Sequence, residues 1–384
     1  MGPVLRLKRG HDRPRMHPWI FKGDVADVGA VDPGDAVTIV DSLGHFVGRG
    51  LFNPRPALCC RVLTRQDQAV DAAFLEARLR EAIGRRRGEP LTRLVWSEGD
   101  GLPGLVVDRY GDVLAVQCLT LGMAKMRRAI VAGLRATVGD LPVFNADDAV
   151  SAALEGFTPE RGWIDRPGSD EVVVDEDGAR LRVRFGVGQK TGLYLDQRLN
   201  HRLVTEGAAG RAVLDAFAYT AGFACHALVR GATRAVCVES SPDALAGARD
   251  NLALNGVADR AELVSLNVFD ELRQLERDGA RFGLIALDPP PFARSRTAVD
   301  AAARGYKDIN LRAMRLLDAG GRLATFSCSH HVSDAMFDDI CRDAAFDAGV
   351  TLRVLARLTQ APDHPVLLTV PETGYLKGLL LEAV

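Results

Sequence analysis

The sequence predicts an α/β chain whose C-terminal part is a doubly wound parallel sheet, preceded by a β-barrel-like domain and a small α+β domain. From Gly186 onward, short apolar strands alternate with helical segments, which is the pattern of βαβ units. The first 65 residues instead carry strand and turn signals, and a mixed segment lies between. We therefore expect domains at 1–67, 68–185 and 186–384, which suits a chain of 384 residues.

The amino-terminal domain is expected to consist of short strands. Residues VLRLK alternate apolar and charged side chains, DPGD is typical of a turn, and AVTIVD is a strand that SLGHF returns as a hairpin. GRGLFN and ALCCRVLT supply two further extended runs. Short strands at this spacing predict a small barrel or sandwich.

The central domain mixes helices and strands. FLEARLREAIGRRR has apolar residues at helical spacing, and two strands joined through Tyr110–Asp112 follow it. MAKMRRAIVAGLRATV predicts one amphipathic helix, and a hairpin with its turn at Asp175–Gly178 closes the domain. The expected order is strand, strand, helix, strand, strand.

The C-terminal domain repeats strand and helix. RAVLDAFAY precedes the helix GFACHALVRG, and RAVCVES precedes the helix PDALAGARDNLALNG. AELVSLN, FGLIALD and GRLATFSCS are further expected strands. The least polar stretch, Ala212–Val229, is interrupted by Asp215, Thr220 and His226, which favours a strand, a turn and a helix over a membrane span.

Composition narrows the class of protein. Hydrophobic residues at 47% and charged residues at 26% are typical of a globular protein. A formal net charge of −2 argues against a uniformly basic nucleic-acid-binding protein but is compatible with a local basic face. The seven cysteines form no zinc-ligand spacing, so we expect no metal site and a reducing compartment. Basic residues near the start interrupt any apolar signal core, so we expect a cytoplasmic protein with no membrane partner.

Polar side chains end three of the expected parallel strands. Ligands bind outside the carboxyl ends of such strands. Asp215 can approach the amino-acid part of a nucleoside ligand, Glu239 can accept from both ribose hydroxyls, and Asn267 can pair with an adenine edge. The turn after Asp215 lacks the GxGxxG of a dinucleotide site, which argues against a nicotinamide oxidoreductase.

These motifs resemble a known family. DAFAYTAGF, VESSPDALAGARDNLALNG and LDPPPF are similar to successive motifs of class I S-adenosylmethionine (SAM) methyltransferases, which have a Rossmann-like fold. KTGLYLDQR, the SCS at Ser327–Ser329 and APDHPV resemble the bacterial 23S rRNA large-subunit methyltransferase I family, which forms 5-methylcytosine. The resemblance covers essentially the whole chain. One departure is Asn267, where the family usually has Asp, although an amide can still accept from the adenine amino group.

The resemblance implies SAM as cofactor and a site assembled from the strand ends. The expected cofactor-binding residues are Gln197, Asp215, Ala216, Phe217, Tyr219, Gly222, Glu239, Ser240, Asn267 and Asp288.

Cytosine C5 is a poor nucleophile, so its methylation requires prior attack at C6, which a cysteine thiolate does well. The resemblance implies that Cys328, in TFSCSHH after a late strand, is this nucleophile. His330 or His331 could help to ionise the thiol, or both could be solvated surface residues. Asp288 is the second expected catalytic residue, because protonated it could donate to cytosine N3 and ionised it could accept from N4.

Two residues beside Asp288 are expected to face the substrate base. Pro289 stiffens the turn after the strand. Phe292 could stack on an extruded base or pack in the core. Other 5-methylcytosine enzymes have a second cysteine in this motif, whereas this chain has Pro291, so the base that removes the C5 proton is unassigned.

The amino end is the expected RNA-binding face. The run GDAVTIVDSLGHFVGRGLFNP resembles a PUA domain, an RNA-binding module. Cationic side chains interleaved with an aromatic suit phosphate contact and stacking on unpaired bases, although a solvated basic face has the same composition. The expected contacts are Arg6, Lys8, Arg9, Arg13, Arg15, Trp19 and Lys22.

The sequence thus predicts a SAM-dependent rRNA cytosine-C5 methyltransferase that binds RNA, with 23S rRNA as the expected substrate. One alternative is methylation of an exocyclic amine or another base atom, because DPPPF suits that chemistry too. Another is an RNA-binding protein with an inactive methyltransferase-like domain. The sequence does not decide between a monomer and a homodimer.

Overall fold

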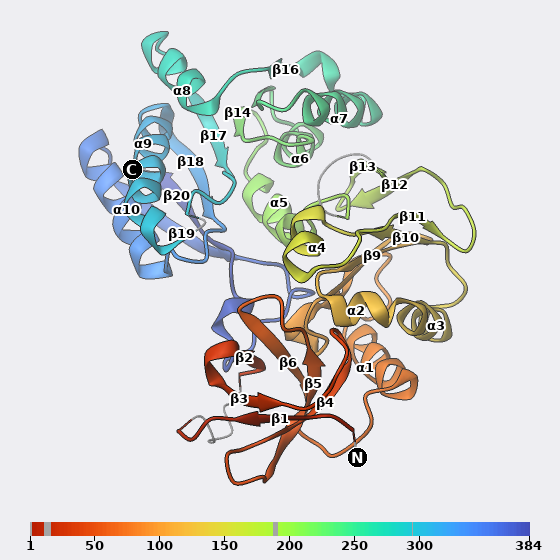
Figure 1. Ribbon diagram of the computed structural model, residues 1–384. Helices are drawn as coiled ribbons and strands as arrows, with labels where there is room; N and C mark the ends of the chain where they lie inside the picture. Colours follow the sequence, from red (N-terminus) through yellow and green to blue (C-terminus); the bar gives the residue numbers. More distant parts are fainter. Residues whose placement is uncertain (1, 11–16, 187–190, 294) are drawn as a thin grey trace. The chain divides into compact units, whose positions relative to one another are not determined.

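The computed structural model describes residues 2–10, 17–186, 191–293 and 295–384 (Figure 1). The chain forms two compact units. The first comprises Met1–Val172, Val183–Leu195 and Pro362–Gly374, and the second Val173–Arg182, Asp196–Ala361 and Tyr375–Val384. The three domain boundaries expected from the sequence stay predictions.

The first unit opens with a six-stranded sheet in the order β2-β6-β5-β4-β1-β3. All of its pairings are antiparallel except β1 with β4. Alternate residues such as Leu5 and Ile39 are fully buried, as a sheet with one covered face requires. The expected β character is therefore confirmed. The strands are β1 Val4–Leu7, β2 Trp19–Phe21, β3 Val25–Val28, β4 Ala36–Val40, β5 Phe46–Phe52 and β6 Leu58–Thr64.

The same unit holds a five-stranded sheet in the order β11-β10-β9-β8-β7, packed against helices α1 and α3. The single helix expected over 123–138 is broken at Met126, where ψ is 3°. The elements are α1 Ala72–Gly84, β7 Leu91–Trp96, β8 Leu105–Tyr110, β9 Val113–Cys118, α2 Leu121–Lys125, α3 Arg127–Val138, β10 Val143–Ala146, α4 Ala149–Glu155 and β11 Arg161–Ile164.

The expected hairpin is present as a separate two-stranded sheet, β12 Glu171–Glu176 and β13 Ala179–Arg184. Both residues of its turn are left-handed, Asp177 with φ 50° and Gly178 with φ 88°. Such a turn matches the twist of the two strands. Residues Val173–Arg182 belong to the second unit.

The second unit contains a seven-stranded sheet in the order β16-β15-β14-β17-β18-β20-β19. The first five strands are parallel, and β20 is antiparallel to both neighbours. The strands are β14 Ala212–Ala216, β15 Arg234–Val238, β16 Ala261–Val264, β17 Phe282–Leu287, β18 Leu317–Ser327, β19 Leu352–Thr359 and β20 Lys377–Ala383.

Helices cover both faces of this sheet. Helices α8, α9 and α10 contribute to one apolar core, whereas α6 packs against β14, β15 and its neighbours α5 and α7. The helices are α5 Arg198–Thr205, α6 Gly222–Val229, α7 Pro242–Leu254, α8 Val268–Arg277, α9 Val299–Arg315 and α10 Asp334–Ala348. The doubly wound sheet expected from the sequence is confirmed.

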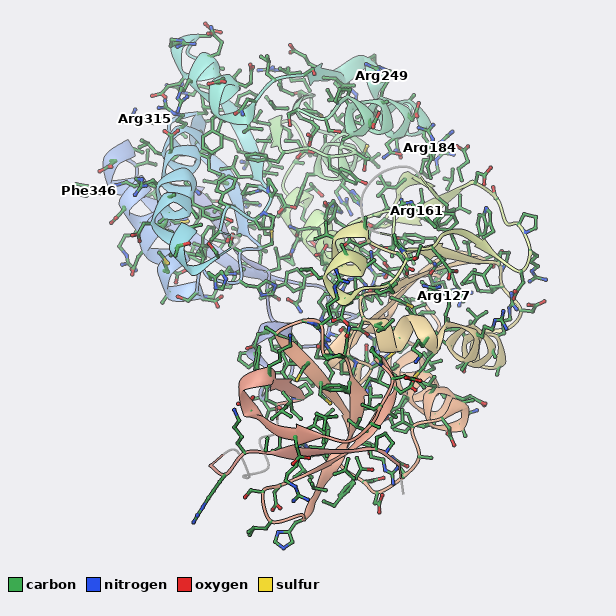
Figure 2. All side chains as sticks on the ribbon, in the orientation of Figure 1. Arg127, Arg161, Arg184, Arg249, Arg315 and Phe346 are labelled. Atoms are coloured by element: carbon green, nitrogen blue, oxygen red, sulfur yellow. The ribbon has the colours of Figure 1, made fainter. Side chains whose placement is uncertain are left out.

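The outer surfaces of α9 and α10 carry both charged and apolar side chains. At the end of α9, Arg315 pairs with Glu276, while Phe346 on α10 is 87% exposed (Figure 2). No helix in the described part of the chain is long and apolar enough to cross a membrane.

Candidate active site

The carboxyl ends of four neighbouring parallel strands form one edge of the seven-stranded sheet. Ala216 at the end of β14 pairs with Val238 of β15 and Leu287 of β17, and Leu287 pairs with Thr325 of β18. This register brings the side chains that follow these strands to a common edge. Chain order reverses between β14 and β17, which makes this the switch point where ligands bind in such folds.

The β14–α6 loop (217–221) has an unusual backbone. Phe217, Tyr219 and Ala221 all have left-handed conformations, with φ of 64°, 48° and 62°. Non-glycine residues in this region cost about 1–3 kcal/mol each and persist only where the surroundings impose them. The chain thus achieves a tight strand-to-helix turn without the glycines that the sequence lacks here.

Several contacts hold the β14–α6 loop. The amides of Phe217 and Ala218 both donate to the Val238 carbonyl, at 3.0 and 3.1 Å. Glu239 accepts from the Tyr219 amide at 3.1 Å and from the Ser241 amide at 2.8 Å. The half-buried Glu239 carboxylate therefore ties the end of β15 to the loop after β14.

Asp215 lies beneath this loop. Its Oδ2 accepts from the Ala224 amide at 2.9 Å, at the start of α6. Burial raises the pKa of Asp215 to about 7. A nearby cation, such as the charged end of a ligand, would favour its ionised form.

Gln197 is buried just before α5, and its Oε1 accepts from Asn200 at 2.6 Å. Its Nε2 is buried and has no hydrogen-bond partner among the described residues. An unpaired buried donor of this kind is expected where a ligand supplies the acceptor. This residue therefore fits a bound polar molecule.

The remaining predicted cofactor residues differ in exposure. Asn267 is exposed and caps α8, accepting from the Phe269 amide at 2.9 Å. Ser240 is exposed and its hydroxyl is 3.4 Å from Glu239. Ala216 is fully buried, and its carbonyl accepts from the Asp288 amide at 3.4 Å.

Cys328 directly follows β18 and lies beside the turn after β17. Its Sγ is 3.7 Å from the carbonyl oxygen of Pro289. Two motifs that are 39 residues apart in sequence therefore meet at the sheet edge. Asp288, half-buried, is the residue before that proline.

Two residues that the sequence did not suggest fix the backbone around Cys328. Tyr306 on α9 is 3.0 Å from the Ser329 hydroxyl, and burial raises the pKa of Tyr306. Lys377 on β20 donates to the carbonyls of Ser329 and Tyr375 at 3.0 and 2.9 Å. Burial lowers the pKa of Lys377. These anchors hold the residue after Cys328 from two sides.

Cys328 also differs from the other cysteines in exposure. All seven lie in the described part of the chain, and Cys328 alone is half-buried while the other six are buried. Burial raises the pKa of both Cys118 and Cys341 to about 12, which suppresses thiolate formation. Cys328 is therefore the most accessible of the seven thiols.

Neighbouring aromatic and histidine residues have mixed environments. The Phe292 ring packs against Tyr306, at a centroid distance of 4.6 Å, and against Phe269, at 5.8 Å. Part of the Phe292 ring is therefore buried in the hydrophobic core. His330 and His331 are both exposed, and the His330 ring lies 6.2 Å from that of Tyr375.

The predicted RNA-binding residues are only partly available on the surface. Arg6 interacts with Asp27 and the Asp41 carbonyl, Trp19 donates to Glu98 at 2.8 Å, and Lys22 donates to the Arg55 carbonyl. Lys8 and Arg9 are exposed. The predicted Arg13 and Arg15 lie outside the described residues.

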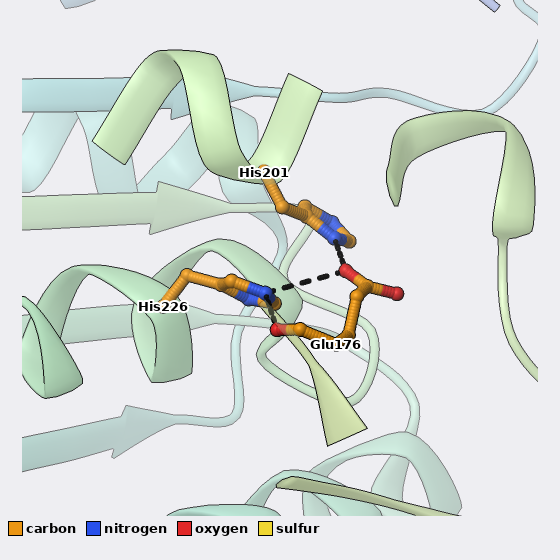
Figure 3. A group of neighbouring side chains, drawn as sticks. All are labelled: Glu176, His201 and His226. Carbon is orange, nitrogen blue, oxygen red and sulfur yellow. Dashed lines mark hydrogen bonds and ion pairs between the residues drawn. The ribbon is translucent and has the colours of Figure 1, made fainter. Parts of the chain in front are cut away.

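A further buried group involves Glu176 of β12, His201 of α5 and His226 of α6 (Figure 3). One ring nitrogen from each histidine and one carboxylate oxygen of Glu176 all lie within 4.8 Å of one another. Residues so far apart in sequence, with no recognisable spacing, could not have been grouped by sequence reasoning.

Comparisons with known proteins identify the family and the domains of this chain. Residues 159–382 match the model of an S-adenosylmethionine-dependent methyltransferase family, and residues 5–65 match a PUA-like domain. A solved methyltransferase structure complexed with SAH (S-adenosylhomocysteine) has a TM-score of 0.85 at 19% identity, with 99% of each chain covered. This likeness shows the fold.

Relatives extend the match to nearly the full chain. The ribosomal RNA large subunit methyltransferase I of Shewanella frigidimarina is 39% identical, with 99% of each chain covered. The protein of the same name from Klebsiella pneumoniae is 38% identical, over 98% of this chain and 97% of the relative. The chain therefore belongs to the S-adenosylmethionine-dependent methyltransferase family that includes these ribosomal RNA large subunit methyltransferase I proteins, and it carries a PUA-like domain.

Proposed function

We propose that this protein methylates C5 of a cytosine in large-subunit rRNA, with Cys328 as the nucleophile. The observation that carries the proposal is the contact between the Cys328 thiol and the Pro289 carbonyl. This contact lies beside Asp288, at the carboxyl ends of the parallel strands where the methyl donor is expected to bind. The named activity of the full-length relatives supports rRNA as the substrate class. A half-buried thiol in this position suits attack on a flat base lying against Asp288-Pro289.

Residues of the sheet edge would hold the methyl donor. SAM supplies an electrophilic methyl group on a sulfonium. In the proposal, Glu239 accepts from the ribose hydroxyls, Asn267 meets the adenine edge, and the unpaired Gln197 Nε2 donates to the ligand. Ionised Asp215 faces the cationic amino-acid end, because a cation offsets the burial that raises its pKa. The other proposed contacts come from Ala216, Phe217, Tyr219, Gly222, Ser240 and Asp288.

Cys328 would act on the base in two stages. Its thiolate forms a bond to C6, which makes C5 nucleophilic enough to take the methyl group. The methyl transfer leaves SAH. A general base, to which no residue is assigned, would then take the C5 proton as the C6–S bond breaks, which releases the thiolate and restores the aromatic ring. Asp288 would hold the base at N3 or N4, and Phe292 would contribute the part of its ring surface that the core leaves uncovered.

The alternative of amine-directed methylation has a different requirement. An exocyclic amine attacks the methyl group directly, so it needs an acceptor such as Asp288 but no thiol. The half-buried Cys328 beside Pro289 favours the C5 reaction over this alternative.

Nucleoside mass mapping of 23S rRNA tests the function. RNA from a strain lacking the gene should be missing one 5-methylcytosine, and the purified protein with SAM should restore it. Loss of an N-methylated base instead would support the amine-directed alternative. Unchanged rRNA would contradict the proposal.

The PUA-like domain is the proposed RNA-binding part. We expect a Lys8→Gln, Arg9→Gln double variant to bind RNA more weakly at low salt. Each lost phosphate contact should reduce the slope of log affinity against log salt by about 0.7–0.9. Filter binding across a salt series measures this.

Surface substitution is preferable to deletion of the domain. Asn53 and Arg61 bind the buried Glu155 carboxylate at 2.8 and 3.0 Å, so deletion would leave that charge unpaired. Arg342→Gln, at an exposed position on α10, is the matched control. Equal RNA affinity and equal salt slope for the double variant and the native protein would exclude Lys8 and Arg9 from the RNA-binding face.

A further inference from the structure

A hairpin outside the seven-stranded sheet contacts helices α5 and α6 through buried ionisable groups. Glu176 at the end of β12 has its Oε1 2.6 Å from His201 Nδ1 and 3.3 Å from His226 Nε2 (Figure 3). All three side chains are buried. Such a cluster must share either protons or a metal ion, because bare lone pairs would repel.

The distances favour protons. Two ligands of a tetrahedral zinc ion, each about 2.0–2.1 Å from the metal, lie about 3.3 Å apart. The 2.6 Å between Glu176 and His201 is instead a charge-assisted hydrogen bond. His226 also faces carbonyl oxygens with both nitrogens, Gly222 at Nδ1 and Glu176 at Nε2, each at 2.8 Å. Carbonyls only accept, so these contacts call for a proton on at least one nitrogen of the His226 ring.

Both histidines engage Gly222, the first residue of α6. His226 contacts its carbonyl, and the His201 ring lies so close that a Cβ on Gly222 would be 2.8 Å from the ring atoms Cε1 and Nε2. Gly222 directly follows the β14–α6 loop, whose three left-handed residues require external support.

Asn251 on α7 gives the loop a second link to the hairpin. Its Nδ2 donates to the Thr220 carbonyl at 2.9 Å, and its Oδ1 accepts from the Arg182 amide of β13 at 2.8 Å. The hairpin thus reaches the β14–α6 loop by two independent routes, through Asn251 and through the histidines.

We infer that Glu176, His201 and His226 form a proton-sharing clasp that positions the β14–α6 loop for binding of the methyl donor. These are positioning residues, and the inference rests on the proposed donor site at that loop. The clasp holds Gly222 in place, so the strained β14–α6 loop keeps its SAM-binding conformation in the absence of SAM. Donor affinity should therefore depend on the protonation of the clasp.

The charges around His201 fix the direction of this dependence. His201 contacts Glu176 on the hairpin at 2.6 Å and His226 on α6 with ring centroids 5.0 Å apart. The negative charges of Asp215 on β14 and Asp288 after β17 also act on it. Although burial opposes the charge, Glu176 and these carboxylates raise the pKa of His201 above 6.5, and His201 lowers that of Glu176 below 4.5. Arg198 on α5 acts on Glu176 in the same direction.

The Glu176–His201 ion pair is therefore intact between the lowered pKa of Glu176 and the raised pKa of His201. It is fully present below the unfolded histidine pKa of 6.5 and is lost as pH rises through the higher folded value. Burial and the His201 charge lower the pKa of His226, so His226 does not supply the pairing at neutral pH. Burial raises the pKa of Asp215 to about 7, so ionisation of Asp215 also makes donor binding depend on pH. A variant that lacks the clasp is needed to separate this dependence from that of the clasp.

Calorimetry with SAH across about pH 6 to 9 tests the clasp. For His201→Gln we expect about tenfold weaker binding near pH 6, converging with the native protein at high pH. In steady-state methylation of RNA, the KM for SAM should rise while kcat at saturating SAM is unchanged. Glu176→Gln preserves the shape and should lower the His201 pKa, measured by NMR of labelled histidines. His45→Gln, an exposed histidine paired with Asp41, is the control.

Either of two results overturns the clasp. One is a folded His201→Gln protein whose SAH affinity matches the native protein at every pH. The other is a stoichiometric metal ion that co-purifies with the protein and whose removal weakens SAH binding. If Glu239→Ala also leaves SAH affinity unchanged, the proposed donor site itself is wrong. If Glu239→Ala weakens SAH binding and His201→Gln does not, only the clasp is excluded.

Discussion

A Cys328→Ser protein should fold, bind SAH with nearly native affinity and lose methyl transfer by about a thousandfold or more. A serine hydroxyl is far less ionised than a thiol and cannot attack cytosine C6 at a useful rate. The half-buried position tolerates the small change in volume. Single-turnover transfer of labelled methyl groups to RNA, with SAH calorimetry and denaturation midpoints, measures the three properties separately.

Cys59→Ser is the matched control for this substitution. Cys59 donates to the Ile20 carbonyl at 3.5 Å, a bond that a serine hydroxyl can also make. It should leave methyl transfer unchanged. If Cys328→Ser lowers the denaturation midpoint but still methylates RNA at close to the native rate, Cys328 is a packing residue and the amine-directed alternative gains support.

Glu239→Ala should weaken SAH binding by about 10- to 100-fold, which corresponds to about 1–3 kcal/mol. The substitution removes the proposed acceptor for two ribose hydroxyls. It also leaves the Tyr219 and Ser241 amides without the carboxylate that they share. Isothermal calorimetry gives the affinity directly. Native affinity in the Glu239→Ala protein would exclude this carboxylate from the donor site.

Much of the fold follows from local sequence patterns. Alternating strands and helices after Gly186 predict the parallel sheet, because each βαβ unit is local and its connection has one favoured hand. The same pattern orders the strand ends, so Asp215, Glu239, Asp288 and Cys328 could be assigned to one edge before any contact was known. Their roles nevertheless remain proposals.

The residues that support this edge could not be predicted in the same way. Lys377 reaches Ser329 only because β20 inserts antiparallel beside β18. Glu176 meets His201 and His226 only because residues Val173–Arg182 of the hairpin pack against α5 and α6 within the second unit. Such pairings depend on tertiary arrangement, and no local periodicity encodes them.

The β14–α6 loop shows a different limit of sequence reasoning. A glycine in the sequence is the usual sign of a left-handed backbone conformation, but here Phe217, Tyr219 and Ala221 adopt that conformation. Their conformations are imposed by distant contacts, among them those from Val238 and Glu239. A search of the sequence for a glycine-rich turn therefore misses this loop.

Covalent trapping on RNA that carries 5-fluorocytosine tests the central claim most directly. Attack by Cys328 on C6 and methylation of C5 leave fluorine where a proton would depart, so the thiolate cannot be expelled. With SAM, the native protein should form a denaturant-stable adduct, and mass spectrometry of its peptides should place the RNA nucleotide on Cys328. Methylation of the fluorinated RNA without any adduct, or an adduct that persists in Cys328→Ser, would contradict the account.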